Sequence, residues 1–322
     1  TCWNWEKMKK IIVILLTVLF SVGLLGCAED DKADKAKETQ KTINIAVMPD
    51  IESIPLIIAE KNGYFEKHGV NVNIQHFKSA KDRDSAYQSG KIDGMITDIV
   101  AVVFANEGGI KQKIIAKNQG DIKLMAGKDS GINTVQNLKG KDIGISSNTI
   151  MEYTLDKMLE AEQIKPEEVN KVAIPQLPTR LEMLQGGKID AAILPDPLAD
   201  LAIANGALVL NSTDAMNNKA GAIAFTDTIL EENPEAVKAV FRAYNDAVDY
   251  LAKEPPENYI DFLIQEQGFP EQVKDTIKLP QFHKAELPDP NIVADVVSWM
   301  RAKDLIKGNY EYKDLVAENI LR

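Results

Sequence analysis

The stretch Gly90-Lys91-Ile92-Asp93-Gly94-Met95-Ile96 returns later in the chain as Gly187-Lys188-Ile189-Asp190-Ala191-Ala192-Ile193. In each copy a glycine closes a helical segment, a short apolar strand follows, and an acidic residue, Asp98 or Asp196, stands at the strand end. A further apolar segment then runs to a glycine. This repeat predicts two similar lobes, with a chance coincidence of two ordinary helix-to-strand turns as the alternative.

Strands and helices alternate around the first copy. Residues 42–48 and 70–74 have the apolar alternation of strands, and each is followed by a helical stretch, up to Lys61 in the first case and over residues 81–89 in the second. Such alternation is typical of layered α/β folds with parallel sheets.

Two apolar strands bracket a central block and are able to carry the chain between the lobes. They are residues 122–126 and 220–225. The predicted division is residues 42–129 plus 221–322 for lobe 1 and residues 130–220 for lobe 2. The helical segment after Phe225 is expected to pack on lobe 1.

Composition excludes several classes of protein. The 322 residues include 37 basic and 48 acidic side chains, which give a formal charge of −11 and make nucleic acid an improbable partner. The cysteines are Cys2 and Cys27, so the body of the chain offers neither a disulfide framework nor a thiolate metal site. The histidines, His68, His76 and His283, lack metal-ligand spacing. No metal site and no cofactor are expected.

The first residues have the layout of a signal peptide. Basic residues up to Lys10 precede an apolar run over residues 11–25, whose helical length of about 22 Å is short of the ~30 Å hydrocarbon core of a membrane. The sequence Leu24-Leu25-Gly26-Cys27 resembles a bacterial lipobox, in which Cys27 is lipidated and becomes the mature N-terminus. An ordinary signal peptide with an incidental cysteine is the alternative.

Residues 1–26 are therefore predicted to be upstream residues before Met8 followed by a lipoprotein signal peptide. Residues 27–41 are predicted to be the lipidated cysteine and a flexible tether, because residues 28–41 are almost wholly polar. The expected location is the extracytoplasmic face of the cell membrane, with the membrane as a partner through the lipid anchor.

Several motifs together resemble one family. They are residues 59–66 (AEKNGYFE), the turn at 90–93, residues 138–145 (LKGKDIGI), and the second turn leading to Pro195-Asp196-Pro197. In order and spacing they resemble the solute-binding proteins of ABC importers, in the branch for nitrate, taurine, alkanesulfonates and thiamine precursors. The resemblance covers residues 42–225.

This resemblance implies a type II periplasmic-binding-protein fold, with two α/β lobes, two crossovers and a ligand cleft between the lobes. It also implies as partners a small-molecule ligand and an ABC permease with its ATPase; a monomer is expected. The enzymatic alternative is a pyrimidine synthase of thiamine biosynthesis on the same fold, which carries a cysteine-rich motif. This chain has no cysteine after Cys27 and none of the common catalytic motifs, so no catalytic residue is predicted.

Open parallel sheets bind ligands beyond the carboxyl ends of their strands. The loops and helix starts expected there supply the candidate ligand-binding residues: Asp50, Ile51, Glu52, Ser53, Ser79, Arg83, Thr97, Asp98, Ser146, Ser147, Asn148, Thr149, Arg180 and Asp196. Some of these residues have a structural role as the alternative to ligand binding. Helix capping is the alternative for Ser147, Asn148, Asp98 and Asp196, and a place on an exposed charged helix face is the alternative for Arg83.

The mixed charges of these candidates do not fix the charge of the ligand. Carboxylates at Asp50, Glu52, Asp98 and Asp196 would disfavour a pure anion. The sequence therefore favours a neutral or amine-bearing solute, such as a pyrimidine precursor of thiamine, over a zwitterionic or sulfonated one.

Overall fold

The computed structural model describes residues 41–322. The predicted signal peptide, Cys27 and the tether as far as residue 40 lie outside the described residues, so they stay predictions. In the part of the chain that is described, no helix combines the length and the apolar character that a membrane crossing requires.

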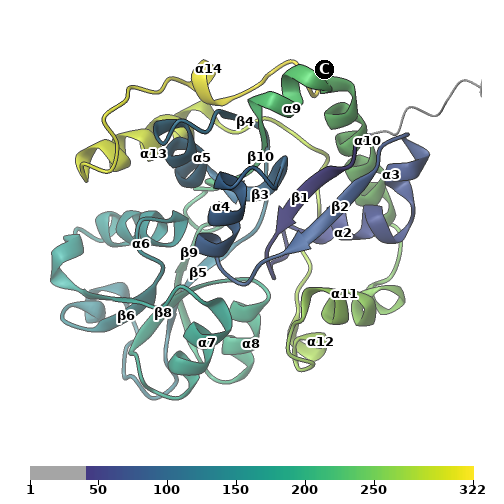
Figure 1. Cartoon of the computed structure of the whole chain (residues 1–322). Coiled ribbons are helices and arrows are strands. Elements are labelled where there is room, and N and C mark those ends of the chain that lie inside the picture. Colours follow the sequence, from purple (N-terminus) through teal and green to yellow (C-terminus); the bar gives the residue numbers. More distant parts are fainter. Residues whose placement is uncertain (1–40) are drawn as a thin grey trace, which may run out of the picture. The chain divides into compact units, whose positions relative to one another are not determined.

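The first sheet has the strand order β2-β1-β3-β10-β4 (Figure 1). Its strands are β1 (Ile43–Val47), β2 (Val72–His76), β3 (Gly94–Asp98), β4 (Gln112–Lys117) and β10 (Gly221–Thr226). Strand β1 is parallel to β2 and β3, whereas β10 is antiparallel to β3 and β4. The helices that follow these strands are α2 (Ile54–Lys61), α3 (Tyr64–Lys67), α4 (Ala80–Gln88) and α5 (Ile99–Glu107).

The second sheet repeats this arrangement with the order β7-β6-β8-β5-β9. Its strands are β5 (Ile122–Ala126), β6 (Asp142–Ile145), β7 (Asn170–Ala173), β8 (Ala191–Pro195) and β9 (Leu208–Ser212). Its helices are α6 (Ile150–Ala161), α7 (Leu177–Gln185) and α8 (Leu198–Ala204), with short 3₁₀ turns η1 (Val135–Leu138) and η2 (Pro166–Glu168). In both sheets the fourth strand is antiparallel to its neighbours.

The sequence repeat has the same structural role in both lobes. Its two copies lead into β3 and β8, the third strand of each sheet. Asp93 Oδ2 accepts a hydrogen bond of 2.8 Å from the Asn44 N–H, and Asp190 Oδ2 accepts one of 2.9 Å from the Asp142 N–H. Each aspartate therefore ties its turn to the neighbouring parallel strand, β1 or β6.

The first crossover lies earlier in the chain than the sequence predicts. Strand β4 ends at Lys117 in the first sheet and β5 begins at Ile122 in the second, so the chain changes lobe over residues 118–121. The expected boundary at residue 129, which put β5 in lobe 1, is wrong at this point. Leu124 and Met125 are fully buried in the core of the second lobe, and an apolar strand carries no signal for which of two cores will bury it. The chain returns over residues 213–220.

The C-terminal segment contacts both lobes, which corrects its assignment to lobe 1 alone. Helix α10 (Pro234–Leu251) packs on α2 and α3, and α13 (Pro290–Ala302) packs on α5, both in lobe 1. Between them lie α11 (Ile260–Gln267) and α12 (Val273–Thr276). These helices and the segment that joins them supply buried side chains to the core of lobe 2: Ile260, Ile264, Phe269 and Val273. The remaining helices are α9 (Asp227–Glu232), η3 (Pro256–Asn258) and α14 (Tyr312–Leu315).

Candidate functional site

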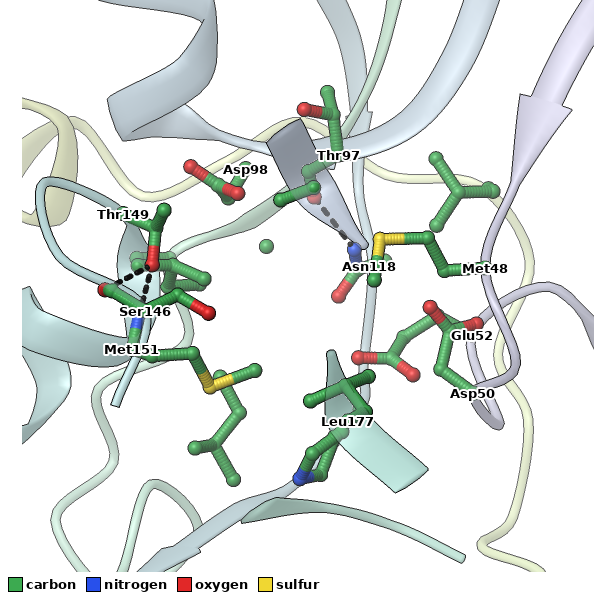
Figure 2. A pocket seen from close by; sticks show the side chains of 18 of the residues that line it. Met48, Asp50, Glu52, Thr97, Asp98, Asn118, Ser146, Thr149, Met151 and Leu177 are labelled. Atoms are coloured by element: carbon green, nitrogen blue, oxygen red, sulfur yellow. Dashed lines mark hydrogen bonds between the residues drawn. The ribbon is translucent and has the colours of Figure 1, made fainter. Parts of the chain in front are cut away.

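A cavity lies between the two lobes beside both crossovers (Figure 2). The space between its walls amounts to about 700 Å³, a figure that includes the solvent at its open mouth. Lobe 1 lines it with Met48, Asp50, Glu52, Ala80, Arg83, Ile96, Thr97, Asp98 and Gly221; lobe 2 lines it with Ile122, Ser146, Thr149, Ile150, Met151, Pro175, Leu177 and Pro195; the crossovers add Asn118, Gly120, Thr213, Lys219 and Ala220. Both lobes therefore contribute walls to one cavity.

Half of the candidate residues predicted from sequence lie in this lining: Asp50, Glu52, Arg83, Thr97, Asp98, Ser146 and Thr149. They come from the loops at the carboxyl ends of β1, β3 and β6 and from the first turn of α4. These residues lie where the rule for parallel sheets predicts, because ligands bind beyond the carboxyl ends of parallel strands.

Three further candidates hold the loops in lobe 1 instead of lining the cavity. Ile51 is buried in the lobe 1 core. The Ser53 hydroxyl donates to Asp50 Oδ1 at 2.6 Å and lies 3.2 Å from the Met48 carbonyl oxygen. Ser79 caps α4, because its Oγ accepts from the Asp82 N–H.

The other four candidates, all in lobe 2, also lie outside the lining. Ser147 and Asn148 are exposed, and the Asn148 N–H donates to Glu152 Oε2 at 2.7 Å. Asp196 forms an ion pair with Lys123. Arg180 is fully buried behind the wall.

Arg180 supports the lobe 2 wall from behind. Its Nε and Nη1 donate to the carbonyl oxygens of Ile174 and Ile193 at 2.9 and 2.8 Å, and its Nη2 donates to Ser146 Oγ. Burial lowers the pKa of Arg180 to about 9, so the side chain stays charged at neutral pH. Ser146 thus lines the cavity with one oxygen lone pair already engaged by a cation.

Asp50 and Glu52 form an acidic corner of the cavity, and Figure 2 shows their side chains next to each other on one side of it. Asp50 Oδ1 accepts from the N–H and the hydroxyl of Ser53, whereas Glu52 Oε2 is buried without a hydrogen-bond partner. Burial raises the pKa of Asp50 to about 6. Burial, and then the neighbouring charge of Asp50, raise the pKa of Glu52 well above its usual range. The corner therefore holds a proton readily.

Arg83 is the cation of the lobe 1 wall, and its charge is already shared. Its Nε bonds Asp84 Oδ1 at 2.8 Å, its Nη1 bonds the Ile96 carbonyl oxygen at 3.1 Å, and its Nη2 lies 3.8 Å from Asp98 Oδ2. Asp98 also caps α5 through the Ala101 N–H at 2.8 Å. Burial raises the pKa of Asp98 to about 6 although Arg83 acts in the opposite direction.

Besides Glu52 Oε2, two further buried polar atoms in the lobe 1 wall have no hydrogen-bond partner. They are Arg83 Nη2 and Thr97 Oγ1, on side chains that are 3% and 4% exposed. Unsatisfied buried polar groups are rare and costly in folded proteins. Both atoms belong to residues of the lining, so the cavity wall offers them to a molecule that would occupy it.

The crossovers contribute lining residues that the sequence analysis missed. An added Cβ at Gly120 would collide with the Glu52 carboxylate, and one at Gly221 would collide with the Asn118 side chain. The Lys219 ammonium bonds the carbonyl oxygens of Gln119 and Gly120, both at 3.0 Å. The glycines and polar residues of these two segments could have indicated lining residues. The sequence does not show this as long as the first crossover is placed near residue 129.

Contacts between the lobes flank the cavity. The Ile51 N–H donates to the Asp196 carbonyl oxygen at 3.3 Å, and Gln176 Nε2 donates to Asp82 Oδ2 at 3.1 Å. Within residues 41–322, no group of three or more histidine, cysteine or acidic side chains is arranged to hold a metal ion.

Comparison with known proteins gives one matching family model, described as NMT1/THI5 like, which covers residues 50–258. A relative from Brachyspira hyodysenteriae, named as a candidate ABC transporter periplasmic binding protein, is 26% identical over 78% of this chain and 76% of its own length. One from Bacillus subtilis, named as a candidate aliphatic sulfonates-binding protein, is 26% identical over 75% and 74%. A 4-amino-5-hydroxymethyl-2-methylpyrimidine phosphate synthase of Saccharomyces cerevisiae is 25% identical over 65% and 67%.

Among solved structures, the alkanesulfonate-binding protein SsuA from Xanthomonas axonopodis pv. citri, bound to MOPS, superposes with a TM-score of 0.73. The match covers 86% of this chain and 98% of that one at 16% identity. It confirms the predicted two-lobed periplasmic-binding-protein fold.

Proposed function

The chain belongs to the NMT1/THI5-like family, and from this premise we propose that it is the extracytoplasmic solute-binding component of an ABC importer. It captures a small polar organic solute in the cavity between its lobes and delivers it to a membrane permease. The relative from B. hyodysenteriae, which is named for the same transport class, supports this role.

The observation that carries the proposal is the construction of the cavity from both lobes and both crossovers. A solute in such a site contacts both lobes, so it binds the closed arrangement more tightly than the open one and shifts the population towards closure. A permease that recognises the closed arrangement then receives only loaded protein.

The alternative function is a pyrimidine synthase of the thiamine pathway, the activity named for the yeast relative. Sulfur and imidazole groups are common nucleophiles and bases, but the cavity lining contains neither cysteine nor histidine. Its acidic corner and apolar walls suit recognition, and we assign binding without chemical conversion.

Membrane attachment through Cys27 is part of the proposal and rests on the lipobox-like sequence 24–27. Residues 27–41 then tether a monomeric binding body near its permease and the cytoplasmic ATPase. Metabolic labelling with an alkyne fatty acid tests the anchor: label that is present in the wild type and absent from Cys27→Ser supports it, and equal labelling of both contradicts it.

Native mass spectrometry of gently purified protein tests solute capture. We expect an added mass from a retained solute, and small-angle scattering should show a smaller radius of gyration for the loaded protein than for the protein after the solute is removed. Met151→Trp fills the lobe 2 side of the cavity and should abolish the added mass. Leu208→Trp, on an exposed residue of β9, is the matched control. Retention by Met151→Trp at the wild-type level would contradict the assignment of the cavity.

A further inference from the structure

The acidic corner of the cavity has no cation committed to it. Arg83 already has Asp84 and Asp98 as partners, and Lys219 is bound to Asp214 and to two crossover carbonyl groups. Asp50 and Glu52 therefore lie in the same wall, each within reach of the other's charge, and Arg83 and Lys219 act on them from a distance and not as ion-pair partners. Two buried carboxylates in this situation need a proton or a cation between them.

The backbone at Gly120 makes room for one of the two carboxylates of this corner. Gly120 leaves room for the Glu52 carboxylate, because any side chain there would occupy its place. Glu52 Oε2 is buried without a partner, and Thr97 Oγ1, on a side chain 4% exposed, is a second buried oxygen without one in the same lining. Both oxygens can accept a hydrogen bond, and the Thr97 hydroxyl can also donate one. The buried donor without a hydrogen-bond partner in this lining, Arg83 Nη2, lies 3.8 Å from Asp98 Oδ2.

The rest of the cavity is mostly apolar. Met48, Ile122, Met151 and Leu177 supply aliphatic and thioether surface, and Figure 2 places the side chains of Met151 and Leu177 across the cavity from Thr97. A solute that fills the site therefore needs an apolar body attached to a hydrogen-bond donor.

We propose that the solute carries a cationic nitrogen group, a protonated amine or amidine, on a short apolar body, and that Asp50 and Glu52 bind this group. This inference rests on the proposed solute-binding function. A sulfonate, the ligand class named for the relative from B. subtilis and for the superposed SsuA, would place negative charge beside two carboxylates and is excluded from this corner.

Three probes of equal chain length test the proposal: butylamine, butyramidine and butane-1-sulfonate, titrated at pH 7.5 with thermal unfolding and calorimetry as readouts. We expect the two cations to bind and stabilise the wild type, and butane-1-sulfonate to leave it unchanged. Glu52→Gln keeps the shape of the side chain but removes the charge, and should weaken cation binding about tenfold or more. Glu167→Gln changes an exposed glutamate on η2 and should bind like the wild type.

The proposal is overturned if butane-1-sulfonate binds the wild type as tightly as the cations do, if neither cation binds, or if Glu52→Gln leaves cation affinity unchanged. The proposed function is judged separately, by the retained solute. Recovery of a sulfonate that Met151→Trp no longer retains would overturn the cationic class while the solute-binding function stands.

Discussion

Arg83 and Arg180 occupy equivalent positions in the two lobes. Each donates its Nη1 to the carbonyl oxygen at the same place in the repeated strand, Ile96 for Arg83 and Ile193 for Arg180. The two guanidinium groups differ at Nη2. The Nη2 of Arg180 donates to Ser146, whereas the Nη2 of Arg83 has no hydrogen-bond partner and belongs to a residue of the cavity wall. The buried arginine at this position therefore supports the wall in lobe 2 and forms part of the candidate site in lobe 1.

The supporting role of Arg180 predicts a large loss of stability on Arg180→Lys. An ammonium cannot reach the three acceptors that the planar guanidinium bonds, so buried carbonyl groups of Ile174 and Ile193 lose partners. We expect the free energy of unfolding in urea to fall by about 3 kcal/mol. Arg242→Lys, at an exposed position of α10, should change it by about 0.5 kcal/mol or less. A loss below about 1 kcal/mol for Arg180→Lys would contradict the supporting role.

The raised pKa of Asp50, about 6, predicts how the stability of the unliganded protein depends on pH. The folded protein holds the proton on Asp50 more tightly than the unfolded chain does. The resulting contribution to the free energy of unfolding is therefore complete below about pH 4 and is lost as the pH rises through about 6. The charged groups that act on this corner are Glu52 and Arg83, with Asp196 and Lys219 acting on Glu52.

Asp50→Asn removes this titration. Between pH 4 and pH 7 we expect the wild type to lose about 2 to 3 kcal/mol relative to Asp50→Asn, measured by urea unfolding at each pH. Parallel curves for the two proteins would show that Asp50 does not titrate in this range. Because a bound cation replaces the proton, butylamine should also reduce the difference between the curves at pH 7.

The sequence predicts the repeat, the two lobes and the family correctly because these depend on local patterns of strand, turn and helix. It does not predict the lobe that buries β5, because apolar strands suit either core. At the site, the position of Asp50 and Thr97 near strand ends is enough to predict that they line the cavity. The same reasoning fails for Ser147 and Asp196, which lie outside the lining. The direction of a side chain depends on its partners, such as Lys123 for Asp196, and these partners lie far away in the sequence.

A hydrogen bond between lobes should affect closure, and one within a lobe should not. Tyr153 on α6 donates to Asp295 Oδ2 on α13 at 2.7 Å, and its ring meets that of Trp299 edge-on at 5.6 Å. Tyr310 donates to Glu107 Oε2 at 2.7 Å, inside lobe 1. Each hydroxyl is worth about 1 to 2 kcal/mol of stability.

Tyr153→Phe should therefore increase the radius of gyration of the unliganded protein in small-angle scattering, whereas Tyr310→Phe should leave it unchanged. Both variants should lose similar stability in urea. Equal radii for the two variants would show that the hydrogen bond of the Tyr153 hydroxyl does not restrain the lobes.

The closest fit in the site is the one between Gly120 and Glu52, and it couples the first crossover to recognition. In Gly120→Ala the new methyl group occupies the place of the Glu52 carboxylate, so the carboxylate has to rotate out of the corner. We expect butylamine affinity to fall about tenfold while the free energy of unfolding changes by about 1 kcal/mol or less, since a flexible side chain yields more easily than backbone.

The double variant Gly120→Ala/Glu52→Ala separates the effect of the steric collision from the effect of losing the carboxylate charge. It should recover the stability of the wild type but not its affinity, because the collision is relieved and the carboxylate is absent. If Gly120→Ala binds butylamine like the wild type, Glu52 does not hold the cation from the position that the structure gives it.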